Sequence, residues 1–73
     1  MEELTALLSD MIPDVDFTAE KALVTSNVID SFDIISIVNE LNKKYGIKIK
    51  VGDMTADNFD SAEKMLALIE RLK

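Results

Sequence analysis

The sequence predicts a small all-α domain, a bundle of three principal helices plus one short helix. Three segments, 2–12, 31–45 and 61–72, carry apolar residues at steps of three and four, the spacing that gives a helix one apolar face. Residues 13–27 have no sustained period and predict a long loop between the first two helices. At 73 residues, the chain is expected to form one domain, 1–73.

The first helix is predicted over residues 2–12, and Pro13 ends it because the residue before a proline is pushed out of the helical region. Glu2 and Glu3 lie in its first turn, where the helix dipole favours negative charge. Its apolar face consists of Leu4, Leu7, Leu8, Met11 and Ile12. In the loop that follows, a short helical turn is compatible with residues 18–22. The loop residues expected to tie it to the core are Phe17, Leu23 and Val24.

The second helix, residues 31–45, gives the strongest helical pattern. Lys43 and Lys44 lie in its last turn, and Gly46 follows at the position that commonly ends a helix. Isoleucine and valine are mediocre helix formers, so tertiary packing is expected to hold this helix. Its apolar face consists of Ile34, Ile37, Val38, Leu41 and Tyr45.

The segment IKIKV, residues 47–51, alternates as a strand would, but no other segment offers it a partner. We therefore expect an extended connector that buries Ile47, Ile49 and Val51. Gly52 and the polar run after it predict a turn or short helix carrying Met54.

The last helix, 61–72, is predicted to begin with Ser61 as its cap. Its apolar face consists of Met65, Leu66, Leu68, Ile69 and Leu72. If the three principal helices share one core, four residues should be fully buried: Leu8, Ile37, Leu41 and Leu66.

Composition excludes several classes of function. Apolar residues make up 48% and charged residues 30%, which is typical of a folded globule. Fourteen acidic and eight basic residues give a net charge of −6, which argues against a nucleic-acid partner and favours a monomer that repels its own copies. Cysteine and histidine are absent, so disulfides, thiolate metal sites and the commonest general base are excluded, and no metal site is expected.

No apolar run approaches the ~20 residues that span a bilayer, and no segment has the pattern of a signal peptide. We therefore expect a cytoplasmic protein without a membrane span.

The stretch IDSFDIISI, residues 29–37, contains the most informative residue, Ser31. Asp30 and Ser31 can both cap the second helix, and Asp33 adds negative charge to that helix end. As a nucleophile Ser31 is poor, because the chain offers no histidine and no GxSxG turn. However, a hydroxyl at a helix N-terminus suits a phosphodiester, since free N–H groups and the dipole both favour an anion.

With these residues in view, the whole chain resembles the acyl carrier protein family. The family motif is D-S-[LF] at the start of the second helix, here Asp30-Ser31-Phe32, preceded by the apolar Ile29. Downstream, ELNKKYGIKI resembles the family's helix end and buried isoleucine pair, and DMTADNFDSAEKM resembles its short third helix and the start of its fourth.

The resemblance implies a carrier rather than an enzyme. A phosphopantetheinyl transferase would move 4′-phosphopantetheine from coenzyme A onto Ser31, with Asp30 helping to position the incoming group or its metal ion. Acyl groups would then travel as thioesters between partner enzymes of a lipid, polyketide or related biosynthetic pathway. The resemblance also implies partner contacts at Phe32, Asp33 and Ile35. It implies an acyl cleft between the second and third helices, for which the candidates are Ile34, Val38, Met54 and Phe59. The alternative for these four is ordinary core.

The second helix departs from the markedly acidic one of housekeeping fatty-acid carriers. It keeps Asp33 and Glu40 but ends in Asn42-Lys43-Lys44, and Ser36 and Asn39 are also neutral. This departure favours a carrier dedicated to one pathway. One alternative is an aminoacyl or peptidyl carrier, such as a D-alanyl carrier, loaded by an adenylating enzyme. Another is a small acidic interaction protein in which Ser31 is only a cap.

Overall fold

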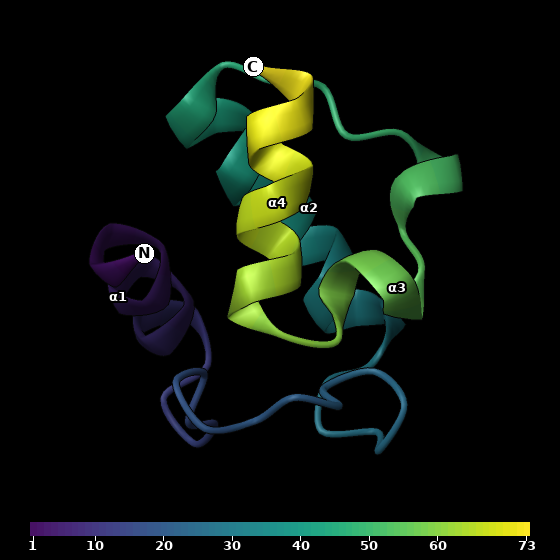
Figure 1. Ribbon diagram of the computed structural model, residues 1–73. Helices are drawn as coiled ribbons and strands as arrows, with labels where there is room; N and C mark the ends of the chain where they lie inside the picture. Colours follow the sequence, from purple (N-terminus) through teal and green to yellow (C-terminus); the bar gives the residue numbers. More distant parts are fainter.

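The computed structural model describes residues 1–73, and all of its regular elements are helical, which confirms the predicted fold class (Figure 1). In chain order the elements are α1 (Glu2–Met11), α2 (Ser31–Tyr45), the 3₁₀ helix η1 (Val51–Asp53), α3 (Ala56–Phe59) and α4 (Ala62–Leu72). Residues 12–30 form the predicted long loop between α1 and α2.

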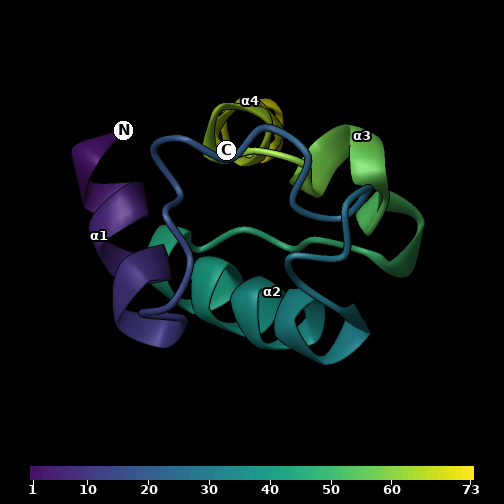
Figure 2. The same ribbon diagram turned by 90° about the horizontal axis from the view of Figure 1, so that it is seen from below.

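The helices surround a single apolar core. Figure 2 shows α2 and α4 on opposite sides of the molecule, with α1 at one edge and α3 at the other. Sixteen buried apolar residues form one cluster between them, drawn from all four α-helices, the long loop and the connector after α2. Because every α-helix contributes, none has a stable position without the others.

Local sequence explains where α2 begins and ends. Asp30 is its N-cap, and Gly46 adopts the left-handed conformation at its C-terminus with a φ of 64°. The predicted bounds of 31–45 are therefore confirmed. α1 ends at Met11, one residue early, because Ile12 precedes Pro13 and takes an extended φ of −133°. α4 begins at Ala62, since the Ser61 side chain accepts the Lys64 N–H at 3.1 Å and is itself the N-cap.

The connector after α2 is extended and pairs with no strand, as expected. Ile47 and Ile49 are buried, and the Asn42 side-chain oxygen accepts the Ile49 N–H at 2.8 Å. Val51 was expected to be buried as well, and that expectation is wrong. It is 82% exposed, because the chain leaves its extended path there and enters η1. Met54 lies half-buried between η1 and α3.

The four residues predicted to be fully buried do not behave alike. Leu8, Ile37 and Leu41 have no exposed surface, which confirms the faces assigned to α1 and α2. Leu66 is only half-buried, so its assignment is wrong. It lies about 90° around α4 from the middle of the buried face, given the 100° that each residue turns. That face consists of Ala62, Met65, Leu68 and Ile69.

The long loop is held to the core by its own side chains. Phe17 and Leu23 are buried and the half-buried Val24 packs against the same core, so all three tie the loop to the core as predicted. A turn follows Asp16, whose carbonyl accepts the N–H groups of Ala19 and Glu20. This turn overlaps the start of the short helical segment that residues 18–22 suggested.

Candidate functional site

Ser31 is the first residue of α2 and lies exposed at its N-terminus. The preceding Ile29 is buried, and its N–H donates to the Leu23 carbonyl at 3.0 Å. Asp30 is extended, with φ −111° and ψ −174°, so the chain leaves the core at Ile29 and presents the next side chain to solvent. An anchored isoleucine followed by one extended residue thus fixes where Ser31 emerges.

Helix capping at this end is done by two aspartates and not by the serine. The Asp30 carboxylate accepts the Asp33 N–H at 3.0 Å, and the Asp33 carboxylate accepts the Asp30 N–H at 3.2 Å. These two bonds form a reciprocal capping box. The sequence allowed Ser31 to share the capping role, but its hydroxyl takes no part in these bonds. The Ser31 hydroxyl is therefore free for a partner.

The first turn of α2 also keeps unused donors. The backbone N–H groups of Ser31 and Phe32 have no acceptor within the protein, because the first bonded amides are those of Asp33 and Ile34. Such amides favour an anion at the helix N-terminus. The carboxylates of Asp30 and Asp33 border the same position, where they oppose an anion and attract a cation.

An apolar groove of about 250 Å³ begins at Ser31. Of the four residues predicted to line a cleft, Ile34 and Met54 line this groove. Val38 and Phe59 do not, since they are 4% and 0% exposed in the core. The full lining is Ser31, Ile34, Ile35, Val51 and Met54.

Sequence reasoning missed Val51 as a groove residue. The alternation in IKIKV placed it with Ile47 and Ile49 in the core. The only signal for the true position is Gly52-Asp53, which marks the turn at which the alternation ends.

The residues predicted to contact partners differ in exposure. Phe32 is 80% exposed, which is the exposed position expected for it, and Ile35 is 48% exposed. Asp33 is half-buried and its carboxylate is engaged by Asp30. Phe32 and Ile35 together give the α2 N-terminus an apolar surface beside Ser31.

Asp60 fastens the long loop that leads to Ser31, and no local sequence pattern predicts this role. Its carboxylate accepts the backbone N–H groups of Val24 and Thr25, both at 2.9 Å, and the Thr25 hydroxyl at 2.7 Å. Its backbone carbonyl accepts the Leu23 N–H at 2.8 Å. The Thr25 hydroxyl and N–H lower the pKa of the Asp60 carboxyl. The turn before Ile29 is thereby held against the α3–α4 junction.

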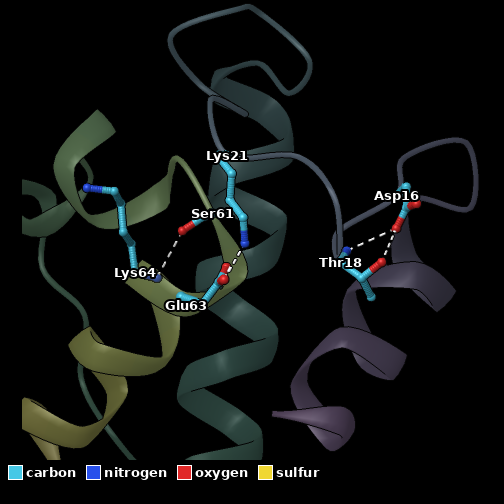
Figure 3. A network of polar contacts seen from close by, with 6 residues as sticks. All are labelled: Asp16, Thr18, Lys21, Ser61, Glu63 and Lys64. Carbon is cyan, nitrogen blue, oxygen red and sulfur yellow. Dashed lines mark hydrogen bonds and ion pairs between the residues drawn. The ribbon is translucent and has the colours of Figure 1, made fainter.

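Two further contacts on this loop are seen in Figure 3. The Lys21 ammonium pairs with the Glu63 carboxylate at the start of α4, and the hydrogen bond from Lys21 lowers the pKa of Glu63. The Asp16 carboxylate accepts the hydroxyl and backbone N–H of Thr18, which lower its pKa in turn. Both contacts are exposed, so they order the loop more than they stabilise the fold.

A second groove, of about 220 Å³, lies between α1, the loop and the start of α4. Its lining includes Thr5, Phe17 and Ala62 but no residue of the Ser31 groove. No group of three or more Asp or Glu residues is arranged to hold a metal ion, and none of the helices has the length and apolar character needed to cross a membrane.

No protein-family model matches this chain, and neither curated proteins nor solved structures include a match to it.

Proposed function

We propose that this protein is an acyl carrier that bears 4′-phosphopantetheine on Ser31 and passes acyl groups, held as thioesters, between separate enzymes. The observation that carries the proposal is the geometry at Ser31. An exposed hydroxyl with no internal hydrogen bond stands at the N-terminus of a 15-residue helix, beside two unused backbone N–H groups. These donors suit the phosphodiester that would join the arm to the serine.

The carboxylates beside Ser31 oppose the anionic phosphodiester of an attached arm but suit the transfer step that would attach it. Asp30 and Asp33 are the nearest carboxylates, and they can hold the cation that accompanies a transferred phosphate group. The arm supplies the thiol that forms thioesters, a sulfur chemistry that this chain does not encode because it has no cysteine. The chain's own residues bind and orient the arm. The partner enzymes must supply the general base, for which this chain has no histidine.

The groove beside Ser31 supports an acyl cargo over an aminoacyl one. Apart from Ser31, its lining is entirely apolar: Ile34, Ile35, Val51 and Met54. Transfer of an apolar acyl chain from water into this groove lowers the free energy. A cationic amino group would find no polar partner among the groove residues. The aminoacyl carrier loaded by an adenylating enzyme therefore ranks second.

The attachment is tested by intact mass after incubation with coenzyme A and a transferase of broad specificity. Wild type should gain one phosphopantetheine, and Ser31→Ala should gain none. Ser36→Ala is a matched control, because Ser36 is also exposed on α2 and its loss should leave modification unchanged. An unmodified wild type with several transferases, or a modified Ser31→Ala variant, contradicts the proposal.

The cargo is tested on the modified protein. With a hexanoyl group on the arm, the NMR signals of the Met54 methyl and the Val51 amide should shift, and with D-alanyl they should stay near those of the unloaded form. Equal shifts with both groups would remove the preference for an acyl cargo while leaving the attachment intact.

A further inference from the structure

Half of the chain's basic residues lie within one short segment. Of the eight Lys and Arg residues, four are Lys43, Lys44, Lys48 and Lys50, which we call the lysine surface. Residues 41–52 contain no Asp or Glu. All fourteen acidic residues and the other four basic residues lie elsewhere, so the rest of the chain carries a net charge of −10. A protein of strongly negative charge thus has one positive region.

The fold spreads these four lysines from the last turn of α2 along the connector, which runs beside α2 to η1 (Figure 2). Lys43 and Lys44 are in its last turn, and the chain reverses at Gly46 into the connector. Because Ile47 and Ile49 are buried, the alternating Lys48 and Lys50 face outward. The 2.8 Å bond from the Ile49 N–H to the Asn42 side chain fastens the connector against α2. The segment that carries Lys48 and Lys50 is therefore fixed by its buried neighbours.

Most of the positive charge on the lysine surface is unpaired. Lys44 forms an ion pair with Glu3 of α1 at 3.1 Å. Lys43, Lys48 and Lys50 are exposed and have no ion pair, although the chain has fourteen carboxylate side chains available. Three free ammonium groups in this segment of an acidic protein are available for an outside partner.

The lysine surface continues an exposed stripe along α2. The residues of this stripe recur at steps of three and four and are all exposed: Phe32, Ile35, Ser36, Asn39 and Lys43. The stripe has no carboxylate, since Asp33 and Glu40 lie to one side of it. It runs about 17 Å along the helix, from apolar residues at one end to Lys43 at the other.

We propose that the lysine surface is a docking site for an acidic patch on a partner protein, and that this partner also covers Phe32 and Ile35. An apolar contact area with charges at its edge is the usual composition of a protein interface. The positive region is also too small for an extended polyanion. Glu3 and Asp53 border it, and the surrounding −10 would repel a nucleic acid or an anionic bilayer beyond the four lysines. This proposal rests on charge and exposure alone and does not depend on a modified Ser31.

A synthetic partner tests the proposal. The probe is a helical peptide of about 15 residues, matching α2 in length, with glutamates on one face and two leucines at one end. Titrated into the ¹⁵N-labelled protein at low salt, it should shift the amide signals of residues 43–50 and of the first turn of α2. A matched peptide with lysine in place of glutamate should shift neither. Shifts centred elsewhere, or no binding of the glutamate peptide, would overturn the proposal.

Two variants of equal net charge distinguish an effect of the lysine surface from an effect of the protein's net charge alone. Changing Lys43, Lys48 and Lys50 to Gln should weaken binding of the glutamate peptide about tenfold, as expected for three peripheral charges. Changing Lys21 to Gln and Lys64 to Glu lowers the net charge by the same three units elsewhere and should weaken it by less than about twofold. Equal weakening by both variants contradicts a docking site at the lysine surface.

Parallel titrations with phosphatidylglycerol vesicles and with a DNA duplex test the other anions. Tighter binding to either than to the peptide, lost in the triple variant, would show that the lysine surface serves a membrane or a nucleic acid instead.

Discussion

Asp30 and Asp33 each accept a hydrogen bond from the other's backbone N–H, at 3.0 and 3.2 Å, and so close the N-terminus of α2 around Ser31. This reciprocal arrangement leaves the serine between them free of any structural task. The sequence allowed Ser31 to cap the helix as well as to carry an attached group, and the structure assigns the capping to Asp30 and Asp33.

The division of roles predicts different effects on stability at these two positions. Asp30→Ala should lower the free energy of unfolding by about 1 kcal/mol, because it removes the N-cap. Ser31→Ala should change it by less than about 0.5 kcal/mol. Urea denaturation followed by circular dichroism measures both, and Asp30→Asn is the control, since asparagine also caps. A loss at Ser31→Ala as large as at Asp30→Ala would mean that the serine supports the helix after all.

The core predicts a ranking of three truncations. Ile37→Ala and Leu41→Ala should each cost about 2–5 kcal/mol, because both side chains are fully buried between α2 and the rest of the core. Leu66→Ala should cost clearly less, about 1 kcal/mol, because Leu66 is half-buried at the side of α4. If the three variants share one denaturant dependence of the unfolding free energy, the midpoints of urea denaturation rank their losses of stability. If Leu66→Ala lowers the stability as much as Leu41→Ala does, the assignment of the buried face of α4 is wrong.

Asp60 predicts a pH dependence of stability. Its folded-state pKa is lowered, so the charged carboxylate stabilises the fold above the unfolded pKa of about 3.9. That contribution is lost as pH falls through the lower, folded pKa. The destabilisation by Asp60→Ala should therefore be largest near neutral pH and should shrink below about pH 4.

Unfolding of wild type and Asp60→Ala across this pH range is the measurement, with Asp57→Asn as a control, since Asp57 is an exposed aspartate of the neighbouring helix α3. Hydrogen exchange at the Val24 and Thr25 amides should quicken in Asp60→Ala, because both donate to the Asp60 carboxylate. A destabilisation that stays constant with pH would show that the charge of Asp60 is irrelevant to the fold.

The proposed carrier role predicts poor use of this protein, once it bears its arm, by housekeeping fatty-acid enzymes with basic docking patches. The α2 stripe offers those patches no carboxylate, and Lys43 repels them. Replacing Ser36, Asn39 and Lys43 with Glu should speed loading or elongation, mainly through the association rate. The gain should shrink as salt rises.

The choice of Asn39 in this variant follows from the structure. Asn42 is also a neutral residue of α2, but its side chain accepts the Ile49 N–H and so holds the connector. A change at Asn42 would therefore alter the folding of the protein as well as its charge. Wild type that already matches the variant at low salt would show that α2 charge does not set partner choice.

The sequence by itself determined the helical elements and the position of Ser31. Apolar spacing located α1, α2 and α4 within one residue, because one-sided periodicity, Pro13, Gly46 and the caps at Asp30 and Ser61 all act within a turn or two of the chain. The exposure of Phe32 agrees with what the family resemblance implied for that position, although a core aromatic was the alternative.

Only the tertiary structure decided which apolar residues line the groove and which fill the core. Val51 and Val38 are the same kind of side chain, yet one is 82% exposed and the other 4%. The Asp60 carboxylate reaches Thr25 across 35 residues of sequence, a distance over which no local pattern operates. Burial is a property of how helices pack against one another, and a side chain at the border of a helix face can lie on either side of that packing.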